Sequence, residues 1–175
     1  MRFSTPSECA NFVRPLGLSA GELLAGKPPA RMKKTCGFFT TAPRIDPRAA
    51  DVIVDCLGAF EEALLWTYDL VFGDQSDDPK ATQSWREYGR WRKSMGARSS
   101  ISDEPGCVFA RSERDDLQRS VLWTMKLGHG SLLVPHPARC VLRFSHEDDV
   151  ILHARTNDPG FRRLGDFGFR PMTRF

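Results

Sequence analysis

The sequence predicts a single α/β (α+β) domain in which helices flank a mixed and mainly antiparallel sheet. A length of 175 residues allows one well-buried core and is short for two. Hydrophobic residues make up 41% of the chain and charged residues 27%, which are ordinary values for a globular protein. Residues 101–155 alternate short apolar runs with one helical pattern, and this mixture favours a sheet covered by helices.

Residues 1–45 are predicted to form two short helices and the first strand. Thr5-Pro6-Ser7-Glu8 has the form of a capping box with proline at the first helical position, and residues 19–22 repeat the capping pattern. Residues 35–41 are rich in aromatic and β-branched side chains, which favour a strand, with Gly37 as a candidate bulge.

Residues 46–100 are predicted to form a helical pair. Apolar side chains recur at steps of three to five and predict one long helix over 47–72, ended by Gly73. After an acidic loop, Asp78-Pro79 is typical of a helix start, and Gly96 ends this second helix. An aromatic ridge with basic residues beside it runs along the second helix.

Residues 101–155 are predicted to form a strand-helix-strand-strand unit. The helix begins near Ser112 and ends at Gly128, where glycine is the common terminator. The predicted strands are 107–110, 131–134, 140–144 and 150–154.

Residues 156–175 form a tail in which phenylalanines alternate with arginines. We expect the aromatic rings to dock this tail on the body of the domain and the arginines to lie at the surface. The glycines and prolines of the tail argue against a long regular element.

The net charge of +3 conceals a segregation of charge along the chain. Residues 49–78 contain eight acidic side chains and no Lys or Arg, whereas residues 79–100 contain six basic side chains and one acid. Local fields of this kind steer partners of opposite charge, so they matter more here than the overall charge.

The acidic segment predicts a surface for a basic protein partner. Asp74, Asp77 and Asp78 would supply the charge, and Trp85 or Trp91 would be the apolar anchor. The basic segments support an alternative, a nucleic-acid-binding module that uses arginine and aromatic side chains. The arginines assigned to that alternative are Arg86, Arg90, Arg92, Arg162 and Arg163.

The four histidines all lie between residues 129 and 153 and suggest a third class of function, a small hydrolase or metalloenzyme. His146 is the catalytic candidate because a turn would expose it beside carboxylates, and His146 with Asp149 is the metal candidate. The chain has no phosphate-binding loop, dinucleotide fingerprint or Cys-x-x-Cys pair, so no cofactor is expected. All five cysteines are expected to be reduced core residues.

The N-terminus lacks the apolar core of a secretory signal, and no stretch reaches the roughly 18 apolar residues of a membrane span. The sequence therefore predicts a cytoplasmic protein without a membrane partner.

Residues 104–154 resemble small bacterial proteins of the toxin-immunity type. The resemblance lies in Glu104-Pro105-Gly106, Asp115-Asp116-Leu117, Leu127-Gly128 and Ser145-His146. Many such proteins carry Gly-Trp-Asp after the helix, and Gly128-His129-Gly130 departs from it. The resemblance implies a non-catalytic protein that binds and blocks a cognate toxin, here a basic one.

Overall fold

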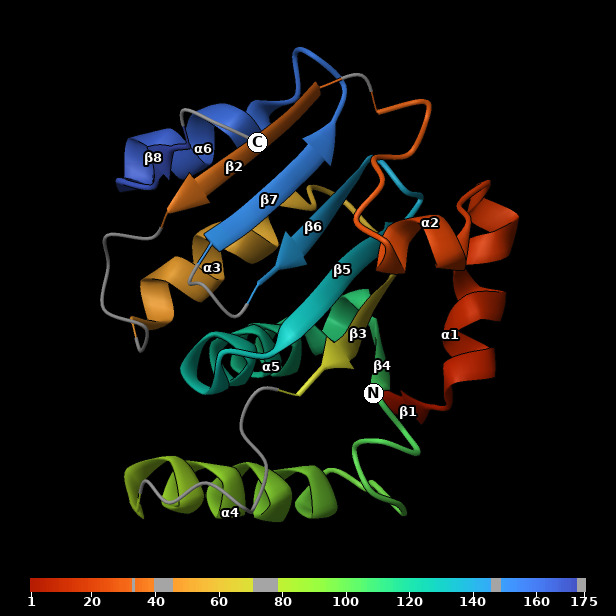
Figure 1. The fold of residues 1–175 in the computed structure, drawn as a ribbon, viewed down its shortest axis with the longest axis vertical. Helices are drawn as coiled ribbons and strands as arrows, with labels where there is room; N and C mark the ends of the chain where they lie inside the picture. Colours follow the sequence, from red (N-terminus) through yellow and green to blue (C-terminus); the bar gives the residue numbers. More distant parts are fainter. Residues whose placement is uncertain (33, 40–45, 71–78, 146–148, 173–175) are drawn as a thin grey trace.

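The computed structural model describes the chain except for residues 33, 40–45, 71–78, 146–148 and 173–175. The described elements confirm a single α+β domain (Figure 1). In chain order they are β1 (Arg2–Ser4), α1 (Pro6–Val13), the 3-10 helix η1 (Arg14–Leu16), α2 (Ala20–Leu24), β2 (Lys34–Phe39), α3 (Pro47–Cys56), β3 (Glu62–Asp69), α4 (Pro79–Ser94), β4 (Gly106–Ala110), the 3-10 helix η2 (Arg111–Glu113), α5 (Arg114–Leu127), β5 (Gly130–His136), β6 (Cys140–Phe144), β7 (Asp149–Ala154), α6 (Pro159–Phe167) and β8 (Arg170–Pro171).

The described strands form one open sheet in the order β1-β4-β3-β5-β6-β7-β2-β8. Every described pairing is antiparallel, which confirms the predicted mainly antiparallel sheet. The short strands β1 and β8, which the sequence analysis did not predict, lie at the two edges. Short edge strands leave few backbone groups open to pairing with another chain.

Helices cover both faces of the sheet, and successive side chains of β3 point alternately to these two faces. Ala63 and Leu65 belong to the larger core, which packs under α3, α5 and α6. Leu64 and Trp66 point to the opposite face, where they pack against residues of α1 and α2. Figure 1 shows α1 and α2 on one side of the sheet, and α4 beyond its lower end. Because both faces are buried, β3 has a continuous apolar run from Ala63 to Trp66.

The predicted helix over 47–72 is wrong, and so is the helical pair assigned to 46–100. Helix α3 ends at Cys56, Gly58 turns the chain at φ 66°, and β3 follows as a central strand. A strand buried on both faces has a continuous apolar run, which periodicity alone does not distinguish from a buried helix. The predicted helix after Asp78-Pro79 is confirmed as α4.

The sequence analysis did not predict α6, which occupies nine residues of the tail where no long regular element was expected. The Asp158 carboxylate caps this helix by accepting a hydrogen bond from the Gly160 backbone N–H at 2.8 Å, and proline follows the cap. Docking of the tail is confirmed by Leu164 and Phe169, which are fully or almost fully buried in the larger core. Phe175 lies outside the described residues.

The remaining predicted elements are confirmed with shifted ends. Helices α1 and α2 begin at the predicted caps, and Thr5 with Glu8 makes the expected capping box. The helix and the four strands predicted in residues 101–155 are present as α5 and as β4, β5, β6 and β7. Strand β2 pairs with β7 without a register shift, so the bulge expected at Gly37 is not there. None of the described helices is both long enough and apolar enough to cross a membrane.

Candidate functional site

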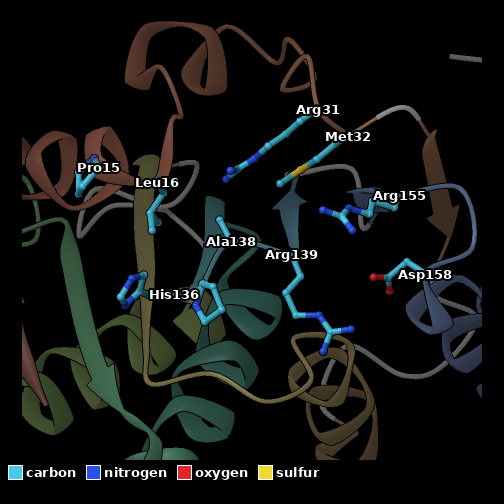
Figure 2. A pocket seen from close by; sticks show the side chains of 10 residues that line it. Pro15, Leu16, Arg31, Met32, His136, Ala138, Arg139, Arg155 and Asp158 are labelled. Atoms are coloured by element: carbon cyan, nitrogen blue, oxygen red, sulfur yellow. The ribbon is translucent and has the colours of Figure 1, made fainter.

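A pocket of about 510 Å³ opens at the end of the sheet where β5 passes into β6 (Figure 2). Helix α4 lies at the opposite end, because it follows β3, whose last residue pairs with the first residue of β5. Four segments that are distant in sequence meet at the pocket. Its lining residues are Pro15, Leu16, Arg31, Met32, His136, Pro137, Ala138, Arg139, Arg155 and Asp158.

The ends of secondary-structure elements place the polar residues of the pocket. Arg139 lies in the turn between β5 and β6, which contains a cis peptide bond before Pro137. Arg155 directly follows β7, and Arg31 lies in the loop after α2. Asp158 is the cap of α6, so the structure of the helix start fixes its carboxylate at the pocket.

The pocket gathers more positive than negative charge. Arg31, Arg139 and Arg155 are exposed, and none of the three guanidinium groups has a hydrogen bond or ion pair with another described residue. Asp158 is the acidic side chain among the lining residues. An open cluster of unpaired guanidinium groups attracts anions and presents forked donors that match phosphate or carboxylate.

The guanidinium groups do not all point the same way. Figure 2 shows the Arg31 side chain extending past Met32 toward Leu16, where its Nη1 would lie 3.9 Å from a Cβ atom at Gly17, whereas Arg155 stands on the other side of Met32. Arg139 points away, toward the chain that follows α3, where its Nη1 would lie 2.6 Å from a Cβ atom at Gly58. The three guanidinium groups therefore lie at different places around the pocket, and Arg139 borders it with its aliphatic stem.

Part of the pocket lining is apolar. Leu16 and Met32 are buried members of the core under α1 and α2, and Ala138 packs against that core. His136 stands at the end of β5 with its Nδ1 3.5 Å from the Glu61 carboxylate. The pocket thus combines cationic and apolar walls, an arrangement typical of sites that orient a small molecule.

The residues predicted to bind a protein partner are only partly described. Asp74, Asp77 and Asp78 lie outside the described residues. Trp85 and Trp91 lie on α4 and are half-buried, turned toward Tyr88 in a small core between α4 and α5. The Trp91 ring stacks on Tyr88 with their centroids 5.8 Å apart. Both tryptophans therefore hold α4 on the body of the domain.

The arginines predicted to bind nucleic acid do not form one surface. Arg86 and Arg90 are exposed on α4, whereas Arg162 and Arg163 are exposed on α6 at the far side of the molecule (Figure 1). Arg163 donates a hydrogen bond to the Asp55 backbone carbonyl.

Arg92 differs from the other predicted arginines because it is buried. Its guanidinium donates to the Glu104 carbonyl at 2.8 Å and lies 4.6 Å from the centre of the Phe3 ring. It therefore anchors α4 and the loop after it, and does not belong to an exposed basic surface.

The predicted metal site lies partly outside the described residues, because His146 is among those left out. Asp149 begins β7, is buried, and accepts a hydrogen bond from the Ser145 hydroxyl. Across the described ranges, no group of three His, Cys, Asp or Glu side chains is placed to hold a metal ion.

The cysteines are free, as predicted, and four of the five are buried, with Cys36 half-buried. Burial raises the pKa of the Cys107 thiol to about 12, and it raises the pKa of Cys140 even further. A thiol with such a pKa is protonated at neutral pH and is a poor nucleophile.

Two histidines are buried in different surroundings. The His153 ring lies 2.9 Å from the Thr35 hydroxyl, with which it shares a hydrogen bond between β7 and β2. His129 packs between α4 and α5, where its ring meets Trp85 edge-on with centroids 5.4 Å apart. Both ring nitrogens of His129 lack a hydrogen-bond partner among the described residues. Burial lowers the pKa of both histidines to about 4.

Comparison with protein-family models, with curated proteins and with solved structures gives no match for this chain. The functional argument therefore rests on the pocket and on its chemistry.

Sequence reasoning missed Arg139 and Arg155 as site residues, and it noted Arg31 only as part of a basic stretch. These three arginines are isolated from one another in the sequence, each following a different element. Arg139 and Arg155 stand just beyond the ends of β5 and β7, and Arg31 lies in the loop after α2. The one signal that they share is a place in a loop, where binding residues are common.

Proposed function

We propose that this chain is a binding protein that holds an anionic ligand in the pocket at the β5–β6 turn. The presence of Arg31, Arg139 and Arg155 in the lining of one pocket, all three unpaired among the described residues, carries this proposal. Guanidinium groups that have no internal partner keep all their donors free for a ligand. A planar fork of donors fits phosphate and carboxylate better than an ammonium group does.

The protein-binding and nucleic-acid interpretations remain predictions. An immunity-type protein that blocks a basic toxin would use Asp74, Asp77 and Asp78, which lie outside the described residues. A nucleic-acid module would now depend on the two exposed arginines of α4, Arg86 and Arg90, because Arg92 is buried.

Charge reversal at the pocket tests the proposal. We expect Arg31→Glu and Arg155→Glu each to weaken binding of inorganic pyrophosphate at least about tenfold, because a charge-assisted hydrogen bond contributes about 1.5–3 kcal/mol. Isothermal titration calorimetry at two salt concentrations measures the loss, and the affinity of the parent protein should fall as salt rises.

Arg90→Glu is the matched control, because it makes the same change of charge on the exposed face of α4. Equal losses in all three variants would show that pyrophosphate responds to overall charge, and the pocket would not be the site. Unchanged affinity in both pocket variants would reject the proposal.

A further inference from the structure

The strand register brings the ends of six neighbouring strands to one end of the sheet. Glu62, the first residue of β3, pairs with the last residues of β4 and of β5. Ala154, the last residue of β7, pairs with the first residues of β6 and of β2. The short turn between β5 and β6 joins these two sets, so the loops of β4, β3, β5, β6, β7 and β2 lie side by side at this end.

These loops carry a row of four exposed arginines. In the order of the strands they are Arg111 after β4, Arg139 in the turn between β5 and β6, Arg155 after β7 and Arg31 in the loop before β2. None of the four guanidinium groups has a partner among the described residues. Neighbouring strands lie about 4.8 Å apart, so the five steps from β4 to β2 extend roughly 24 Å. A single phosphate or pyrophosphate covers only part of such a row, whereas anionic groups linked in a chain match its length.

The row passes through two adjacent hollows that meet at Arg139. Arg139 lines the pocket described above, and its guanidinium turns toward Gly58 (Figure 2). Gly58 also lines a second hollow of about 360 Å³, together with Arg111 and Arg114. Because Arg114 is paired with the Asp55 carboxylate, Arg111 is the arginine of the second hollow that remains available to a ligand.

Carboxylates lie among these arginines and restrict the chemistry of the chain. Glu61 is exposed just before β3, and Asp158 lines the first pocket. One oxygen of Asp158 accepts from the Gly160 backbone N–H, and a carboxylate has lone pairs left for further donors. Polyphosphate or the side chains of an acidic peptide would bring only more negative charge to these positions. Nucleic-acid bases bring amino groups, from which aspartate and glutamate accept hydrogen bonds.

Flat exposed groups at this end also suit bases. The His136 ring is half-exposed and lines the first pocket. Unpaired bases stack on histidine rings and on the planes of guanidinium groups. Each arginine of the row can therefore present its edge to a phosphate or its face to a base.

We propose that this end of the sheet binds single-stranded nucleic acid, an inference that rests on the proposed anion-binding function. The phosphates bind the row of arginines, while bases stack on the His136 ring and donate to Asp158. A flexible single strand can follow the loops through both hollows, whereas a duplex is stiff and keeps its bases paired. This surface is separate from the arginines of α4 and α6 that the sequence suggested for nucleic acid.

The dependence of affinity on salt tests the row. Fluorescence anisotropy with a labelled single strand of about 12 nucleotides and mixed sequence gives the binding constant at several salt concentrations. Four phosphate contacts predict a slope of about −3 for the logarithm of affinity against the logarithm of salt concentration. Arg111→Gln and Arg155→Gln should each reduce the steepness of this slope by about 0.7 and weaken binding about fivefold at roughly 0.1 M salt.

Arg90→Gln is the matched control, because it removes the same charge from α4 at the opposite end of the molecule. It should change neither the slope nor the affinity. A change as large as in the two variants of the row would show that the strand binds through overall charge, and it would overturn the inference.

Arg111 separates this inference from the proposed function, because it lies outside the first pocket. Arg111→Gln should weaken binding of the strand and leave pyrophosphate affinity unchanged. If pyrophosphate binds and Arg111→Gln has no effect on the strand, the extended surface is wrong and the anion-binding pocket stands. A duplex or an oligoglutamate of equal length that binds as tightly as the single strand would overturn the choice of ligand alone. If neither pyrophosphate nor the strand binds, the proposed function itself fails.

Discussion

The free energy of unfolding should fall by about 3 kcal/mol for each of two buried histidines as the pH drops from about 6.5 to about 4. The pKa of His129 and of His153 is lowered from 6.5 to about 4, first by burial. Between these values the unfolded chain takes up protons that the folded chain does not. Stability is therefore complete above about pH 6.5 and is lost as the pH falls toward 4.

The neighbours of the two rings act in different directions. Asp69 partly opposes the lowering of the His129 pKa, whereas Arg92 adds to it. At His153 the second cause is Arg143, which also disfavours a protonated ring. Both positions therefore favour the neutral imidazole, and burial is the main cause at each.

Replacement of each histidine by leucine separates the two contributions. His129→Leu should remove about half of the pH dependence, and at pH 7 it should leave stability unchanged or raise it, since both ring nitrogens lack described partners. His153→Leu should remove the other half but lower stability at pH 7 by about 1 kcal/mol, because the Thr35 hydroxyl loses its partner.

Urea unfolding at pH 7.0 and at pH 4.5 measures these differences, and comparison between variants removes the contribution of the carboxyl groups. If His129→Leu shows the same pH dependence as the parent, then His129 titrates normally and is not buried as described. A loss of several kcal/mol in His129→Leu at pH 7 would show that its ring has a partner among the residues not described.

Gly106→Ala should destabilise the protein by about 1–3 kcal/mol, the range for overpacking in a core. Gly106 begins β4, where β1 and β3 pair on either side of it. A Cβ atom at Gly106 would overlap the Cys9 Sγ of α1 and would lie 3.3 Å from Leu64 Cδ1 and from Ser4 Cβ. Cys9 is fully buried, so its sulfur has little room to move.

A double-mutant cycle tests this contact. Cys9→Ala removes the sulfur, so Gly106→Ala should cost at least about 1 kcal/mol less in the Cys9→Ala background than in the parent. Denaturant unfolding of the four proteins gives the coupling energy, and strict additivity would exclude the overlap as the cause.

Gly89→Ala is the control, because a Cβ atom there meets nothing within 4 Å and the residue lies inside α4. It should raise stability by about 0.5–1 kcal/mol through helix propensity. Destabilisation at this position as well would point to a general intolerance of added atoms.

The sequence was most informative where chemical signals are local. Capping side chains with proline placed the starts of α1, α3 and α4, and Gly128 marked the end of α5. These signals act within four residues, so they do not depend on the rest of the fold. Short apolar runs separated by turn residues predicted β4 to β7, and these signals are local as well.

The error at residues 57–72 arises because the burial of β3 depends on residues that are distant in the sequence. Leu64 and Leu65 are both buried because separate helical layers cover the two faces of β3. The sequence shows that both side chains are apolar, but it does not show which neighbours cover them. A residue buried from two sides loses the alternation that distinguishes a half-exposed strand from a helix.

By itself, the sequence determined the α+β class, the antiparallel character of the sheet, most helix starts and the unpaired state of the cysteines. The tertiary structure decided the position of β3, the burial of Arg92 and His129, and above all the pocket. Arg31 and Arg155 are 124 positions apart, so no local pattern relates them. They line the same pocket because β2 pairs with β7, with Lys34 opposite Ala154, and such long-range proximity depends on the packing of the whole sheet.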